Sequence, residues 1–134
     1  MTKKELSERL TVFAVRIVKM VDSMPNTISA HAIARQIVRS GTSPSANYRA
    51  ACLAKSDKDF LNKLKMVEEE LDETNHWLDI IMRTGMLPTG RMSELHLESQ
   101  ELLNIISKSV VTMKAKIKAD EDAKKNSKYF RYSK

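Results

Sequence analysis

The chain contains few of the residues that interrupt regular structure. Its 134 residues include three glycines and three prolines, well below average usage, so turns are scarce and long helices are favoured. Aromatic residues make up only 5% of the chain. Leu, Ile, Ala, Met, Lys and Glu are abundant, and all but isoleucine are strong helix formers. At this length we expect one domain with a substantial hydrophobic core.

Cysteine and long apolar runs are equally scarce. The single Cys52 excludes an internal disulfide, and its Ala-rich surroundings predict a small buried side chain rather than a nucleophile. No stretch approaches the roughly 18 consecutive apolar residues of a membrane span. The first ten residues lack the apolar segment of a signal peptide. We therefore expect a cytoplasmic protein without membrane contact.

The residue groupings that carry catalysis are also missing from the sequence. Glu73 and His76 have the spacing of one di-iron ligand pair, but such a site needs a second copy of the pair and two further glutamates. No glycine-rich phosphate loop is present. The sequence thus predicts a protein that is not an enzyme and needs no metal or other cofactor.

What the sequence does contain is a repeated amphipathic pattern. In four segments, apolar residues recur at alternating steps of four and three, the spacing of one buried helical face. The predicted helices are residues 6–24, ending before Pro25; residues 27–54; residues 57–84, between a capping Ser56 and Gly85; and residues 94–119, after a capping Ser93.

These segments predict an all-α fold, an antiparallel up-down-up-down four-helix bundle over residues 1–119. Residues 120–134 have no apolar period and are expected to form a basic, mobile tail. Two sets of apolar residues lie off the buried stripes, and they suit either a subunit interface or a wider monomer core: Val12, Val15, Val18 and Val21 in the first helix, and Ala46, Ala50, Ala51 and Ala54 in the second.

The stretch RSGTSPSANYRAA, residues 39–51, is the main irregularity in the pattern. Gly41 can end a helix and Ser43 can cap a restart with Pro44 in its first turn, which predicts a kink near residues 40–43. The gathered amides and hydroxyls, with Arg39 and Arg49, form a candidate anion site. Alternatively, the hydroxyls only cap and the arginines pair with the acidic residues 68–73.

Positive charge is distributed unevenly along the chain. The net charge is +6, and residues 1–55 hold nine Lys or Arg against three Asp or Glu. Such an excess suits phosphate binding by charge, without base-specific contacts. In the tail, basic residues alternate with aromatic ones, which can stack on unpaired bases. The candidate RNA- or DNA-binding residues are Arg9, Arg16, Lys19, Arg35, Arg39, Arg49, Lys55, Lys124, Lys125, Lys128 and Arg131. The alternative is a protein-interaction scaffold, for example for a polymerase, with incidental charge.

Residues 39–78 carry a long ungapped motif, RSGTSxxANYRAAxxAKSxxDFxxKLxxVEEELDETxxWL. This motif resembles the bacterial four-helix-bundle family associated with intervening sequences in 23S ribosomal RNA genes, over roughly residues 6–118. The resemblance implies a homopentameric ring. It also implies similarity in fold to the accessory variability protein of diversity-generating retroelements, which is basic and engages reverse transcriptase and nucleic acid. The chain departs from the pattern at Pro44 and Ser45, and at Asn75 and His76.

The recurrent positions of this family are mostly polar. In this chain they are Arg39, Ser40, Ser43, Asn47, Tyr48, Arg49, Ser56, Phe60, Glu69, Glu70, Glu73 and Trp77. We interpret them as a paired set that fixes helix register, since buried charges require partners. The predicted polar network consists of Asn47, Arg49, Glu69, Glu70 and Glu73.

Overall fold

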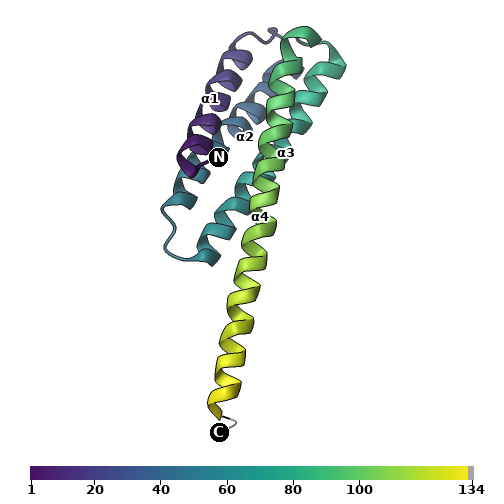
Figure 1. Cartoon of the computed structure of the whole chain (residues 1–134). Helices are drawn as coiled ribbons and strands as arrows, with labels where there is room; N and C mark the ends of the chain where they lie inside the picture. The colour runs from purple at the N-terminus through teal and green to yellow at the C-terminus, as the bar shows by residue number, and fades with distance from the viewer. Residues whose placement is uncertain (133–134) are drawn as a thin grey trace.

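The computed structural model describes the backbone of residues 1–132 and the side chains of residues 1–128. These residues form four helices and no strand (Figure 1), which confirms the all-helical prediction. The helices are α1 (Lys3–Asp22), α2 (Ile28–Cys52), α3 (Asp57–Thr84) and α4 (Thr89–Tyr132). None of the described helices has an apolar stretch suited to crossing a bilayer.

The helix ends follow from local side-chain chemistry. Thr2, Thr27 and Ser56 cap α1, α2 and α3, and each side-chain oxygen accepts a hydrogen bond from the amide three residues later. Gly85 ends α3 with φ of 69°, a conformation that glycine adopts without strain. The predicted Ser56 and Gly85 boundaries are therefore confirmed. The predicted cap at Ser93 is wrong, because α4 begins one turn earlier and Ser93 Oγ donates to the Thr89 carbonyl at 2.8 Å.

The predicted apolar stripes form the core. Leu10 and Ile17 of α1, Leu71 and Leu78 of α3, and Ile106 of α4 are all fully buried. Burying each such side chain stabilises the fold by roughly 1.5–3 kcal/mol. The stripes thus hold the four helices together along their length.

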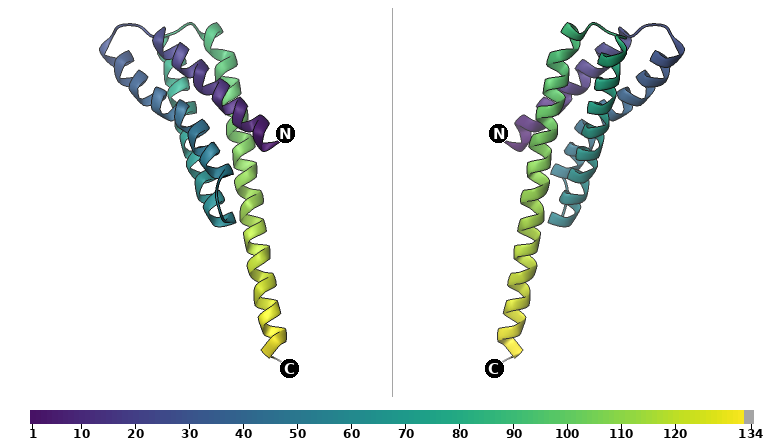
Figure 2. Two further views of the ribbon diagram at one scale, coloured as in Figure 1. Left: turned by 90° about the vertical axis from the view of Figure 1, so that its left-hand side faces the viewer. Right: turned by 90° about the vertical axis from the view of Figure 1, so that its right-hand side faces the viewer.

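Successive helices run in alternating directions (Figure 1). The α1–α2 and α3–α4 connections lie at one end and the α2–α3 connection at the other. Each helix packs against the next along the chain, whereas α1 and α4 contact each other least among the packed pairs. Both views in Figure 2 show α4 extending well beyond the other three helices.

This extension corrects the predicted end of the last helix at residue 119, because α4 continues to Tyr132. Ion pairs of 3.4 Å between Lys116 and Asp57 and 3.5 Å between Lys58 and Glu121 join the extension to the start of α3. Beyond Glu121 the side chains are exposed through residue 128.

The α2 helix contains no interruption at residues 40–43, so the predicted end at Gly41 and restart at Ser43 are wrong. Thr42 Oγ1 donates to the Val38 carbonyl at 2.6 Å, and Ser43 Oγ donates to the Arg39 carbonyl at 2.7 Å. The hydroxyls thus bond to the preceding turn of their own helix. Because the helix is continuous, no free amides gather there, and the anion site expected at a helix restart does not form.

Candidate nucleic-acid interface

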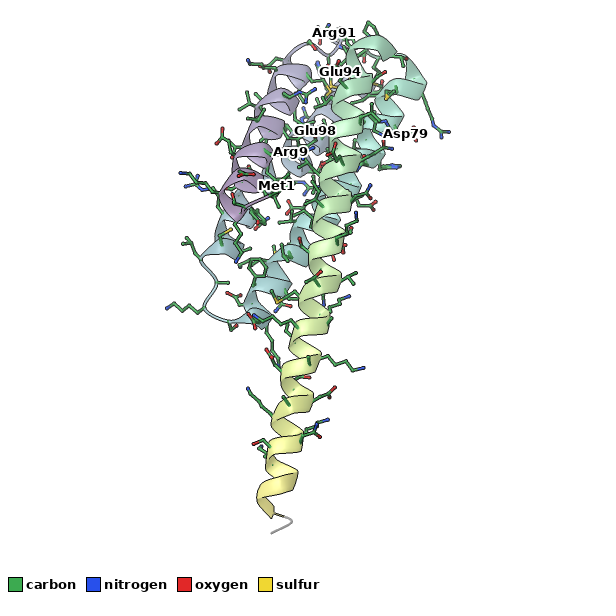
Figure 3. The ribbon with its side chains drawn as sticks, viewed as in Figure 1. Met1, Arg9, Asp79, Arg91, Glu94 and Glu98 are labelled. Carbon is green, nitrogen blue, oxygen red and sulfur yellow. The ribbon has the colours of Figure 1, made fainter. Side chains whose placement is uncertain are left out.

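The structure separates the predicted basic residues into paired and unpaired groups. Arg9 of α1 lies opposite α4 (Figure 3) and donates to both oxygens of Glu98, at 2.9 Å from Nε and 2.6 Å from Nη2. Its Nη2 also lies 2.9 Å from Glu101 Oε1. The hydrogen bond to Glu98, followed by that to Glu101, raises the pKa of Arg9 above its ordinary value. Arg9 is therefore engaged in joining two helices.

Arg39 is paired in the same way. One of its terminal nitrogens donates to both carboxylate oxygens of Glu73, at 2.8 and 2.6 Å. This contact joins α2 to α3 on an exposed face. Arg9 and Arg39 thus have carboxylate partners that any phosphate would have to displace.

The other predicted basic residues with described side chains form no ion pair within the described part of the chain. They are Arg16 and Lys19 of α1; Arg35 and Arg49 of α2; Lys55 after α2; and Lys124, Lys125 and Lys128 of the α4 extension. Except for the half-buried Arg16, all are exposed. The predicted Arg131, together with the aromatic residues of the tail, lies outside the residues whose side chains are described.

Arg49 lies in the last turn of α2. It lines an open pocket of about 810 Å³ with two cations from the first turn of α1, Lys3 and Lys4, and with the exposed Cys52 and Leu53. Glu8 is the one carboxylate among the described lining residues. The expectation that Cys52 is buried is therefore wrong.

Three further cations on α4, which the sequence did not predict as binding residues, lie near predicted ones. Arg91 was assigned to a turn but belongs to the first turns of α4, beside Arg16 and Lys19. Lys114 and Lys118 are exposed on α4 and share a helical side with Lys125, since residues four and eleven apart return to one face. The four-residue spacing of Lys114 and Lys118 could have indicated this shared side. It was overlooked because these two lysines were assigned to the bundle and Lys125 to the tail.

The predicted polar network forms only in part. Asn47 Nδ2 donates to Glu70 Oε1 at 2.6 Å. Arg49 instead lines the pocket with Lys3 and Lys4 of α1, and Glu73 pairs with Arg39. Glu69 is exposed and makes no ion pair with any described residue. A buried link from Thr74 Oγ1 to Ser40 Oγ, 2.9 Å long, adds a second α2–α3 contact. These contacts hold the register of α2 against α3.

Two further features concern the metal-ligating and titratable side chains. The described residues include no group of three or more His, Cys, Asp or Glu side chains placed to hold a metal ion. Tyr48 is buried, and burial, with a smaller effect of Cys52, raises its pKa to about 12. Tyr48 therefore stays protonated near neutral pH.

Comparison with known proteins identifies the fold and the family. A crystal structure of a protein of unknown function from the S23 ribosomal protein family, from Bacteroides thetaiotaomicron VPI-5482, is 32% identical with a TM-score of 0.73. The alignment covers 78% of this chain and 97% of that one. No curated protein matches the chain. The family model described as 23S rRNA-intervening sequence protein matches residues 3–108. The chain, with its four packed helices, therefore belongs to the 23S rRNA-intervening sequence protein family.

Proposed function

We propose that this protein acts without catalysis, by binding RNA or DNA through a basic surface that attracts phosphates by charge. The observation that carries the proposal is the set of exposed cations without carboxylate partners among the described residues, on α1, α2 and the α4 extension. A cation already held by a carboxylate gains little from a phosphate, whereas an unpaired one releases counterions from the nucleic acid. The strength of binding therefore depends on these unpaired residues.

The arrangement favours contacts to the backbone of the nucleic acid rather than to its bases. The cations are spread over separate helices, and lysines follow one side of the protruding α4. Phosphate contacts position a protein on nucleic acid but carry no sequence information. We therefore propose binding that is insensitive to sequence and strongly dependent on salt.

This proposal predicts a defined effect of charge reversal at Arg35, an exposed residue of α2. The Arg35→Glu variant is expected to bind a 30-nucleotide RNA about tenfold more weakly at low salt, with a shallower dependence of log affinity on log salt concentration. Fluorescence anisotropy over a salt series measures both quantities.

The matched control for this test is Arg83→Glu. Arg83 is also exposed, but it pairs with Asp79 four residues earlier at 3.1 Å, so its reversal is expected to change affinity much less. If the wild type fails to bind RNA and single-stranded DNA at low salt, or if Arg35→Glu binds as the wild type does, the proposal is wrong.

We also propose that the chain forms a homo-oligomeric ring, with the pentamer implied by the family resemblance. Val12, Val15 and Val18 on the outer side of α1 are 49%, 47% and 41% exposed. Such a row of valines is suited to burial against a second copy, because each gains free energy on leaving water. A ring would multiply the unpaired cations and hence the number of phosphates contacted at once.

The valine row also supports the second candidate function, a scaffold that presents the oligomer to a protein partner with incidental charge.

Val15→Asp is expected to convert the oligomer to monomer, since it places a charge in the apolar row. Light scattering after size-exclusion chromatography measures the mass, with Lys63→Asp on α3 as the control. Monomeric wild-type protein would contradict the ring. A protein partner retained by the wild type after nuclease treatment, but lost in Val15→Asp, would favour the scaffold.

A further inference from the structure

A small pocket lies between α1 and the start of α4, at the end of the bundle that holds the α3–α4 connection. Its volume is about 220 Å³. Arg16 and Lys19 of α1 and Arg91 of α4 line it, over apolar residues that include Leu87, Met92 and Leu95. These three apolar residues are buried in the core. The three cations therefore line one pocket whose floor is apolar and buried.

The register of α1 against α4 explains why these cations meet. Two helical turns from the pocket, Arg9 lies opposite Glu98 (Figure 3), and there the charges are complementary. Because the helices run in opposite directions, moving seven residues forward along α1 and seven backward along α4 gives the next pair on the same faces. That pair is Arg16 and Arg91, two like charges that line one pocket, whereas the preceding pair is a salt bridge.

No carboxylate compensates this charge within the pocket. All the described residues that line it are basic or apolar, and none of the three cations forms an ion pair with any described residue. Glu94, one turn after Arg91, is exposed and does not line the pocket. Converging cations repel one another, and a bound anion would remove that repulsion. The first turn of α4, which begins at Thr89, adds the positive end of the helix dipole.

We propose that Arg16, Lys19 and Arg91 form a binding pocket for one phosphate group. Two guanidinium groups can each donate two parallel hydrogen bonds to phosphate oxygens, and the lysine adds a mobile point charge. The volume is below the roughly 300–1,000 Å³ of pockets that enclose whole small molecules. It suits a single phosphate that is either free or part of a longer chain. Binding of a nucleic-acid phosphate rests on the function proposed above, whereas binding of free phosphate does not.

The test compares thermal unfolding in inorganic phosphate and in chloride at equal ionic strength. For the wild type, saturating phosphate is expected to raise Tm by about 3 °C, because the anion binds only the folded state. Arg91→Glu and Lys19→Gln are expected to lose this increment. The Arg91→Glu variant should also have a higher Tm than the wild type in chloride, since the introduced carboxylate would face Arg16 with opposite charge. A purely structural role of Arg91 predicts the reverse.

The control is Arg83→Glu, an exposed cation outside both the pocket and the proposed binding surface, which is expected to keep the full increment. The proposal is overturned if the wild type gains nothing from phosphate, or if Arg91→Glu and Lys19→Gln retain the gain. Loss of the gain in Arg83→Glu would also overturn it, because a diffuse effect of charge would then explain the result.

RNA binding by the same variants identifies the source of the phosphate. If Arg91→Glu loses both the phosphate increment and about tenfold in RNA affinity, the pocket holds a backbone phosphate. If RNA affinity is unchanged while the increment is lost, the pocket binds free phosphate and its role in nucleic-acid binding is overturned. If the wild type binds no RNA, but phosphate raises its Tm and Arg91→Glu and Lys19→Gln lose that increment, the pocket stands while the proposed function fails.

Discussion

Replacing Gly41 by alanine is expected to lower the free energy of unfolding by about 2 kcal/mol, although alanine favours helix by up to ~1 kcal/mol. A Cβ at position 41 would lie 2.8 Å from Cγ2, 2.9 Å from Cγ1 and 3.2 Å from Cβ of Ile17. Ile17 is fully buried, and the atoms in conflict are those nearest its backbone. Relief of the overlap therefore requires α1 and α2 to move apart.

Chemical denaturation measures this loss, and Gly90→Ala provides the control. Gly90 lies in the first turn of α4, where an added Cβ would meet no atom within 4 Å. Gly90→Ala is expected to be neutral or stabilising by up to about 1 kcal/mol. The loss in Gly41→Ala should also be smaller when Ile17 is first changed to alanine, since the two sites then no longer conflict. Equal effects at the two glycines would show that α1 and α2 are not in close contact.

The role of Gly41 also shows why an interruption was predicted at residues 40–43, where α2 is continuous. Gly41, Thr42, Ser43 and Pro44 are typical of a turn when each is considered by its own propensity. In the structure the glycine allows close packing on α1, and the hydroxyls bond to their own helix. Packing against neighbouring helices outweighs local preference here, and a single sequence does not reveal which helix approaches which residue.

The helical segments with strong apolar periodicity were predicted well because their local pattern itself marks the face that packs against other helices. In α3, the buried residues recur at the predicted alternating steps of three and four, and Ser56 and Gly85 bound the helix. The α4 extension was missed because it has no apolar period: its described side chains beyond Glu121 are exposed. Its alanine, glutamate and lysine residues favour helix by intrinsic propensity without forming an apolar stripe.

The candidate site was predictable only as a set of residue types. Charge counting identified the basic residues of α1 and α2, but their partners lie on other helices. Arg39 meets Glu73 and Arg9 meets Glu98, residues that are far apart in sequence. Which cations remain unpaired therefore depends on helix register, and so does the meeting of Arg16 with Arg91.

The second large effect is expected at the Arg9 pair. Arg9→Ala should lower the free energy of unfolding by about 2 kcal/mol, because it leaves the largely buried carboxylate of Glu98 without its partner. The Glu98 side chain is only 19% exposed, and α1 and α4 have few other contacts. In the exposed pair of Arg83 and Asp79, the corresponding Arg83→Ala is expected to cost less than about 0.5 kcal/mol.

A double-mutant cycle isolates the contribution of the pair. Glu98→Gln keeps the shape of the side chain and removes its charge, so Arg9→Ala should cost much less in a Glu98→Gln background. The expected coupling between the two positions is at least about 1 kcal/mol. The helix register that pairs Arg9 with Glu98 also brings Arg16 opposite Arg91. A coupling near zero would therefore contradict both the salt bridge and the like-charge pocket one heptad away.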